Sequence, residues 1–143
     1  MIRKLLYLFL NLFLRIFTRV ETKGENNGPE KGAAIFAINH IGRLDMVLAF
    51  ISIKRWDATG WAAEKYQTWP LFGWLIKNLQ GVWVNRQNPG VAAIKEAKKY
   101  LNAGWLFGVA PEGTRSETRT LQEGKPGGAY LASVTGVPVI PVG

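Results

Sequence analysis

The chain has 143 residues, enough for one domain with a substantial hydrophobic core. Apolar residues make up 48% of it and charged residues 20%, which excludes an intrinsically disordered chain, and the lack of cysteine excludes disulfides, thiolate metal ligands and a cysteine nucleophile. Lysine and arginine outnumber the acids by 18 to 10, and the net charge of +8 favours an anionic partner such as a lipid surface, a phosphorylated substrate or nucleic acid.

Residues 1–20 are rich in Leu and Phe, contain neither Pro nor Gly, and carry only cations as charged groups. This composition predicts a helix. Lys4, Asn11, Arg15 and Thr18 recur at spacings that place them on one narrow stripe and leave the rest of the circumference apolar. We interpret residues 1–20 as an interfacial helix, with its apolar side among lipid acyl chains and its cations at the headgroups.

Two other interpretations of this helix stay open, namely a helix that simply packs on the domain and an uncleaved membrane-spanning anchor. A spanning helix needs about 20 apolar residues, and the apolar stretch from Leu5 to Phe17 is interrupted by Asn11 and Arg15. A cleaved signal peptide is disfavoured, because residues 15–19 offer no small-residue cleavage site.

Residues 21–32 are rich in Gly, Asn, Pro and charge, and we expect them to be an exposed linker. From residue 33 onward, short apolar runs alternate with helical segments. The expected strands are 33–38, 58–63, 81–84, 105–109 and the extended segment 137–142, and the expected helices are 45–53, 70–79, 91–101 and 127–134. This alternation predicts an α/β fold over residues 33–143, a mostly parallel central sheet flanked by helices and preceded by the amphipathic membrane-associating helix.

The only histidine, His40, follows the first expected strand, and Asp45 comes five residues later. Histidine moves protons near neutral pH, since its free pKa is about 6.5. A carboxylate that holds the other ring nitrogen fixes the tautomer and stabilises the imidazolium. A spacing of five does not place two side chains on one straight helical face, so this pair requires His40 in a loop and Asp45 at the start of a helix, folded back beside it.

Two further segments place cations directly after expected strands, where α/β sheets bind their ligands. Residues 111–116 combine Gly113, which lets the backbone approach a ligand closely, with Arg115, whose guanidinium binds phosphate through paired donors. Asn85 and Arg86 follow the strand 81–84 in the same way. The alternative for both segments is a surface turn with a solvated arginine.

Several classes of site are disfavoured by the sequence. Gly124 and Lys125 resemble the end of a P-loop, but Pro126 stands where Ser or Thr is needed. There is no Gly-x-Ser-x-Gly elbow for a serine hydrolase, and one His without Cys does not make a structural zinc site. The six tryptophans mostly lie in apolar runs, which indicates core or membrane-edge residues and no stacking platform, so we do not expect nucleic-acid binding.

Four segments occur in a characteristic order: His40 with Asp45, residues 81–86, residues 111–116, and the proline-bearing residues 137–142. Together they resemble the motifs of the glycerolipid acyltransferases typified by 1-acylglycerol-3-phosphate (lysophosphatidate) acyltransferase. The resemblance covers roughly residues 33–142. Gly42 and Ala110 depart from the family pattern, which often has Ser and Phe at these positions.

The resemblance implies an enzyme that transfers a fatty acyl group from acyl-CoA or acyl-carrier protein to the free hydroxyl of a lysophospholipid such as 1-acylglycerol-3-phosphate. The product is phosphatidate, in phospholipid biosynthesis. The resemblance implies His40 as the general base, Asp45 as its orienting carboxylate, and no metal or bound cofactor. The implied acceptor-binding residues are Arg86, Glu112, Gly113, Thr114 and Arg115.

The resemblance also implies a membrane-associated protein on the cytoplasmic face, because the acyl donors are cytoplasmic. Family members usually continue past the fourth segment, so we expect the catalytic domain and its acyl tunnel to extend beyond Gly143. One alternative keeps the family but changes the acceptor to glycerol-3-phosphate, another lysophospholipid or an amino-lipid. The other alternative is a non-catalytic lipid-binding membrane module.

Overall fold

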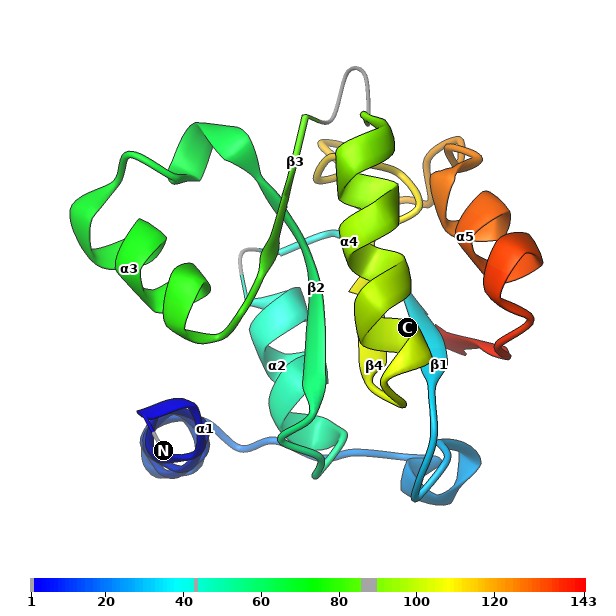
Figure 1. The fold of residues 1–143 in the computed structure, drawn as a ribbon. Coiled ribbons are helices and arrows are strands. Elements are labelled where there is room, and N and C mark those ends of the chain that lie inside the picture. Colours follow the sequence, from blue (N-terminus) through cyan, green and yellow to red (C-terminus); the bar gives the residue numbers. More distant parts are fainter. Residues whose placement is uncertain (1, 43, 86–89) are drawn as a thin grey trace.

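Parallel strands form one sheet at the centre of the computed structural model, which describes residues 2–42, 44–85 and 90–143 (Figure 1). The strand order is β3-β2-β4-β1-β5. The strands are β1 (Ala34–Ile38), β2 (Ala58–Ala63), β3 (Val82–Val84), β4 (Leu106–Val109) and β5 (Val139–Val142). The helices are α1 (Ile2–Phe17), α2 (Asp45–Ser52), α3 (Pro70–Asn78), α4 (Val91–Asn102) and α5 (Gly127–Thr135), with short 3-10 turns η1 (Glu25–Asn27) and η2 (Glu64–Tyr66).

The predicted α/β fold with a parallel sheet is confirmed, and each expected strand and helix is present with small shifts at its ends. The first helix, expected over residues 1–20, ends at Phe17, and the last strand, expected from residue 137, begins at Val139. Pro138 lies before β5 but still accepts a hydrogen bond from the backbone N–H of Ile35 at 2.9 Å. The proline has no N–H of its own to donate to a neighbouring strand.

The sheet has a switch point between β1 and β4. These strands pair in parallel, with Ala37 opposite Val109, so both carboxyl ends lie at the same edge of the sheet. The chain leaves β1 through α2 toward β2, and it leaves β4 through α5 toward β5 on the other side. Connections that diverge in this way open a crevice outside the carboxyl ends of the strands, where α/β proteins bind ligands.

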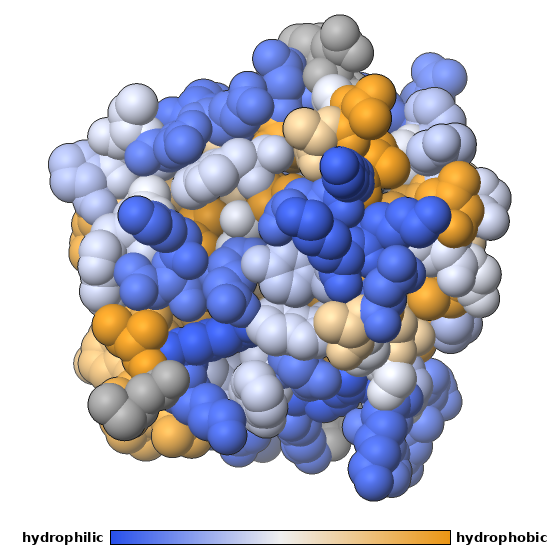
Figure 2. Space-filling model, viewed as in Figure 1, coloured by the Kyte–Doolittle hydropathy of each residue, from blue (hydrophilic) through white to orange (hydrophobic). Residues whose placement is uncertain are grey.

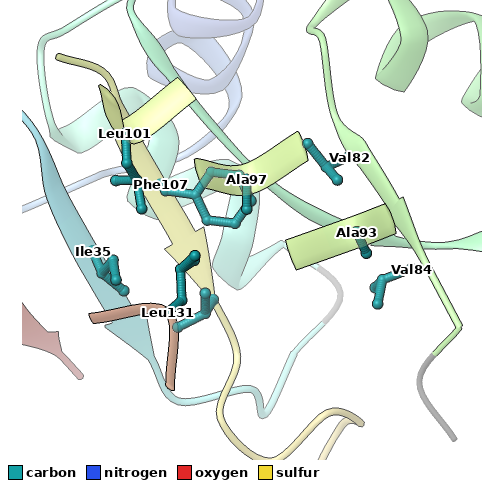
Figure 3. Packing of buried hydrophobic residues seen from close by; sticks show 9 residues of the cluster. Ile35, Val82, Val84, Ala93, Ala97, Leu101, Phe107 and Leu131 are labelled. Atoms are coloured by element: carbon teal, nitrogen blue, oxygen red, sulfur yellow. The ribbon is translucent and has the colours of Figure 1, made fainter. Parts of the chain in front are cut away.

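The core lies on both faces of the sheet. On one face α4 and α5 pack over β1, β3 and β4 around the fully buried Phe107 (Figure 3). On the other face α2 packs through Ala49 against Ala34, Phe36 and Leu106. Because Phe107 and Leu106 are consecutive residues of β4, they point to opposite faces, as the alternation of a strand requires.

Helix α1 docks on this domain through a buried cation. Arg3 donates hydrogen bonds to Oε1 of Gln80 at 2.6 Å and to the carbonyl of Ala58, and its guanidinium lies 4.1 Å from the ring centre of Trp105. Burial lowers the pKa of Arg3 to about 10. The stripe of Lys4, Asn11, Arg15 and Thr18 therefore does not account for every polar residue of α1, since Arg3 lies outside it and anchors the helix.

The opposite side of α1 stays exposed and apolar. Figure 2 shows apolar atoms gathered at the lower left of the molecule, where α1 lies. Within the ranges that the structure describes, no helix combines the length and apolar character needed to cross a bilayer. The exposed apolar residues of α1 are Ile2, Leu5, Leu8, Phe9, Leu12, Phe13, Ile16 and Phe17.

Arg55 ties the segment between α1 and β1 to the sheet. Its guanidinium donates to the carbonyls of Pro29 at 3.1 Å, Gly32 at 2.8 Å and Gly104 at 3.0 Å. It also pairs with both carboxylate oxygens of Asp57, at 2.9 and 2.6 Å, and this hydrogen-bonded pair holds the pKa of Asp57 below its ordinary value. Residues 21–32 are thus fixed at one end although most of them are exposed.

Candidate active site

His40 and Asp45 lie side by side at the carboxyl end of β1. His40 stands in the loop after β1, and Asp45 is the first residue of α2. Nδ1 of His40 lies 3.5 Å from Oδ2 of Asp45. The same Oδ2 accepts hydrogen bonds from the backbone N–H groups of Ile41 and Gly42, each at 2.6 Å. The carboxylate is therefore held by the loop and faces the imidazole, in the arrangement that the spacing requires.

Gly42 leaves room for this carboxylate. A Cβ added at Gly42 would lie 2.8 Å from Oδ1 of Asp45, closer than ordinary contact. A side chain at this position would require the carboxylate to shift. Gly42, which departs from the family pattern, therefore lies where a larger residue would press on Asp45, the carboxylate that faces His40.

The loop after β4 holds the backbone of His40 on both sides. The N–H of Ser116 donates to the carbonyl of His40 at 2.7 Å, and Oε1 of Glu112 accepts from the N–H of His40 at 3.4 Å. Glu112 is only 5% exposed, and its Oε2 has no hydrogen-bond partner among the described residues. The positions of His40 and of this loop are consequently linked through main-chain contacts.

Ser116 has a structural role that we did not predict from the sequence. It ends the segment 111–116, but no role was assigned to it from the sequence. Its Oγ donates to the carbonyl of Thr120 at 2.7 Å, so this buried serine connects the loop to His40 on one side and to residues 117–122 on the other. The only sequence feature that could have indicated this role is that Ser116 is a small polar residue at the end of the 111–116 segment.

The turn at Gly113 requires glycine. Its φ is +70°, a left-handed conformation that side chains disfavour. A Cβ here would also lie 3.1 to 3.3 Å from the end of the Lys125 side chain. Lys125 is fixed beside this turn, because its N–H donates to the carbonyl of Pro111 at 2.7 Å. From the sequence we considered Lys125 only for a P-loop, and the structure places it against the 111–116 segment.

An apolar cavity of about 520 Å³ extends from His40 along the α2 side of the sheet. This volume is typical of a small-molecule site. Arg115 lines the same cavity, and most of the other lining residues are apolar side chains of α2, α3 and the neighbouring strands, with Leu10 of α1 among them. A single hollow therefore joins an imidazole, a guanidinium and an apolar chamber.

A second hollow, of about 1040 Å³, lies between the 18–30 segment, α2 and β5. Asp45 lines it, but His40 does not. Since a proton-transfer site needs the imidazole, we assign the candidate active site to the first cavity.

The structure brings together most of the residues named from the sequence. His40, Asp45 and Glu112 meet at the edge between β1 and β4, Gly113 follows Glu112 in the same loop, and Arg115 shares the cavity of His40. Thr114 is exposed beside them. Arg86 lies outside the described residues. In the described part of the chain, no three metal-ligating side chains come together.

Comparison with known proteins gives the family. The family model Acyltransferase matches residues 19–143. Over 121 residues the chain is 36% identical to the 1-acyl-sn-glycerol-3-phosphate acyltransferases of Salmonella typhimurium and of Escherichia coli K12, a match that covers 78% of this chain and 46% of each relative. With the protein of the same name from Bacillus subtilis it shares 28% identity over 114 residues, covering 79% of this chain and 56% of the relative.

The fold has a solved counterpart. The structure is similar to that of the 1-acyl-sn-glycerophosphate (LPA) acyltransferase, PlsC, from Thermotoga maritima, with a TM-score of 0.77 and 30% identity. The similarity covers 97% of this chain and 57% of that one. The chain spans about half the length of the curated relatives that it matches. Since the family model covers most of its residues, the chain belongs to the acyltransferase family.

Proposed function

We propose that this chain carries the acyl-transfer centre of a 1-acyl-sn-glycerol-3-phosphate acyltransferase. The observation that supports this most directly is that His40 lies 3.5 Å from Asp45 and lines a cavity that Arg115 also lines. The reaction joins the acyl carbon of a thioester to the free hydroxyl oxygen of the acceptor. The carbon–sulfur bond breaks, and phosphatidate and a free thiol are formed.

His40 takes the proton of the acceptor hydroxyl as the oxygen attacks the thioester carbonyl. Asp45 lies at Nδ1, so we assign Nε2 as the atom that accepts the proton, and the negative carboxylate stabilises the imidazolium that forms. The proton then passes to the departing thiolate. General-base catalysis of this kind contributes about 10²–10⁴-fold to the rate. The thioester is already activated, so no covalent acyl-enzyme is needed.

Arg115 binds the phosphate of the acceptor, because a guanidinium offers paired donors to phosphate oxygens. Gly113, Thr114 and Arg86 complete the proposed acceptor site, and Glu112 supports it with Oε1 on the His40 backbone and Oε2 able to accept a hydrogen bond from the acceptor. Fixing the phosphate places the hydroxyl near His40, and such positioning contributes up to about 7–11 kcal/mol to catalysis.

The apolar cavity holds a fatty acyl chain, and each buried methylene contributes about 0.8 kcal/mol to binding. The donor is a soluble thioester, acyl-CoA or acyl-carrier protein. Helix α1 attaches the chain to the cytoplasmic face of a membrane. Its exposed apolar residues and its exclusively cationic charges support this attachment.

Acyl transfer by the full chain tests this function. Purified protein is incubated with a long-chain acyl-CoA and 1-acylglycerol-3-phosphate, and phosphatidate and free thiol are measured together. We expect both products in equal amounts. Parallel reactions with glycerol-3-phosphate, another lysophospholipid and an amino-lipid identify a different acceptor. Vesicle binding without transfer to any acceptor would instead identify a lipid-binding module.

A further inference from the structure

Helix α3 leaves an apolar surface exposed to solvent. Trp69, at its N-terminal cap, is 56% exposed, and Leu71, Phe72 and Trp74 are 79%, 40% and 48% exposed. All six tryptophans are among the described residues, none is fully buried, and two of the three exposed ones belong to this surface. A helix of a soluble domain usually buries such residues, so this surface points to a partner.

The charges around α3 suit the surface of an anionic bilayer. The exposed Lys65 and Lys77 stand near the two ends of α3 with no acid between them, and the exposed Glu64 directly precedes Lys65. Tryptophan is enriched at the level of lipid headgroups, and lysine binds there to anionic lipids. Trp69, Trp74 and these two lysines therefore fit a lipid leaflet as the partner of α3. A protein partner would be expected to meet a surface with both signs of charge.

The same residues form part of the cavity wall. Trp69 and Phe72 are exposed on the outside and also line the cavity that contains His40. Leu10 of α1 lines this cavity as well. Helices α1 and α3 thus border one hollow, and both carry exposed apolar residues. A lipid leaflet lying against both helices would cover an apolar opening that leads to His40.

The aromatic part of the α3 surface is fixed in position. Ring centres of Tyr66 and Trp69 lie 5.0 Å apart, and those of Tyr66 and Phe72 lie 5.3 Å apart, both in edge-on geometry. Gly73 packs so closely on the preceding turn that an added Cβ would lie 2.5 Å from the carbonyl of Gln67. A preorganised surface loses little conformational freedom when it enters a leaflet.

We propose that α3 is a second lipid-contacting helix, which inserts Leu71 and Trp74 at the headgroup boundary and places the opening of the cavity against the leaflet. This inference rests on the proposed membrane attachment through α1. Two separate contacts fix the orientation of the domain on the membrane, which a single helix does not. An acyl chain then passes between the leaflet and the cavity without crossing water.

Vesicle flotation tests the inference. The full chain, the double variant Leu71→Ser/Trp74→Ser, and the control Val91→Ser are mixed with vesicles of phosphatidylcholine and phosphatidylglycerol. Val91 is 84% exposed on α4, which covers the opposite face of the sheet from the cavity. We expect the double variant to partition at least about tenfold more weakly, since two apolar side chains no longer enter the leaflet. The control should match the wild type.

A second measurement uses conservative substitutions and so avoids replacing large residues by serine. Quenching of tryptophan fluorescence by brominated lipids is compared between the wild type, Trp74→Phe and Trp83→Phe. Trp83 lies half-buried in β3. We expect Trp74→Phe to lose a large share of the quenched signal and Trp83→Phe to lose little. Equal quenching of both variants, together with unchanged partitioning of the double variant, would overturn the proposal.

The outcomes separate this inference from the proposed function. Acyl transfer to a short-chain, monomeric lysophosphatidate in solution should proceed equally in the double variant and the wild type, because Leu71 and Trp74 do not line the cavity. A wild type without this activity refutes the catalytic proposal alone. A variant of α1, Leu8→Ser/Leu12→Ser, that abolishes binding while the α3 variant binds normally refutes the role of α3. If the wild type sediments as a dimer and the α3 double variant sediments as a monomer, the partner of α3 is a second copy of this chain.

Discussion

Ser116 donates its backbone N–H to the carbonyl of His40 at 2.7 Å, so the loop after β4 holds the residue that follows β1. The two strands are neighbours in the sheet, and their carboxyl ends meet at one edge. Glu112 contacts the N–H of the same histidine. The proposed base and the proposed phosphate-binding segment are therefore parts of one hydrogen-bonded unit, and changes in one are expected to affect the other.

Asp45→Asn should lower the turnover number by about 10²-fold or more. The amide keeps the size of the carboxylate but loses the negative charge that stabilises the His40 imidazolium in the proposed mechanism. Its oxygen can still accept from the N–H groups of Ile41 and Gly42, so the melting temperature should change little. Steady-state kinetics and thermal unfolding of the same preparation check both parts. If the turnover number of Asp45→Asn equals that of the wild type, the pairing of His40 with Asp45 does not contribute to catalysis.

Arg115→Ala should raise the apparent KM for 1-acylglycerol-3-phosphate by about 10- to 100-fold, because a charge-assisted hydrogen bond contributes about 1.5–3 kcal/mol. Arg115→Lys should recover part of this loss, since it restores the charge without the paired donors. A monoacylglycerol acceptor lacks the phosphate and serves as the control. If the alanine variant is impaired equally with both acceptors, Arg115 does not bind the phosphate.

Gly113→Ala should lower the free energy of unfolding by about 1–2 kcal/mol through its left-handed conformation alone. Contact with Lys125 should add to this loss. Gly32 is a matched control, because its φ is +87° but a Cβ there would meet no atom within 4 Å. Urea unfolding of both alanine variants separates conformation from contact. Equal losses at the two positions would show that Lys125 moves aside freely.

Asp57 should contribute to the pH dependence of stability. Its hydrogen bonds with Arg55 hold its pKa below the ordinary 3.8, so the folded chain releases this proton more readily than the unfolded chain. The stabilisation is present above pH 3.8 and is lost as the pH falls through the folded pKa. The pair is partly exposed, so the effect should stay below about 1 kcal/mol. Urea midpoints at pH 6 and below pH 3 should differ less in Asp57→Asn than in the wild type.

The sequence was informative where the residue type itself carries the signal. Apolar runs of strand length predicted β1 and β4, and the spacing of His40 and Asp45 predicted a loop residue beside a helix start. The Ser116 contact could not be predicted, because a backbone hydrogen bond between two loops leaves no mark in residue type. The burial of Arg3 was also missed, since a cation near the start of a Leu-rich helix gives no sign of which side it faces.

The tryptophans show a different limit. Trp69 and Trp74 lie in an apolar segment, which is compatible with a buried helix or with a membrane edge. Only the fold shows that α3 lies at the rim of the cavity with both residues exposed. Periodicity predicts that a helix has an apolar side, but it does not identify what that side contacts.

The central claim is that His40 removes the proton from the acceptor hydroxyl. The most direct measurement is the turnover number of His40→Ala in the full chain, with a long-chain acyl-CoA and 1-acylglycerol-3-phosphate and with thiol release as the readout. We predict a decrease of at least about 10²-fold, with the melting temperature and vesicle binding of the wild type retained. Undiminished turnover in a folded, vesicle-bound His40→Ala variant would contradict the account.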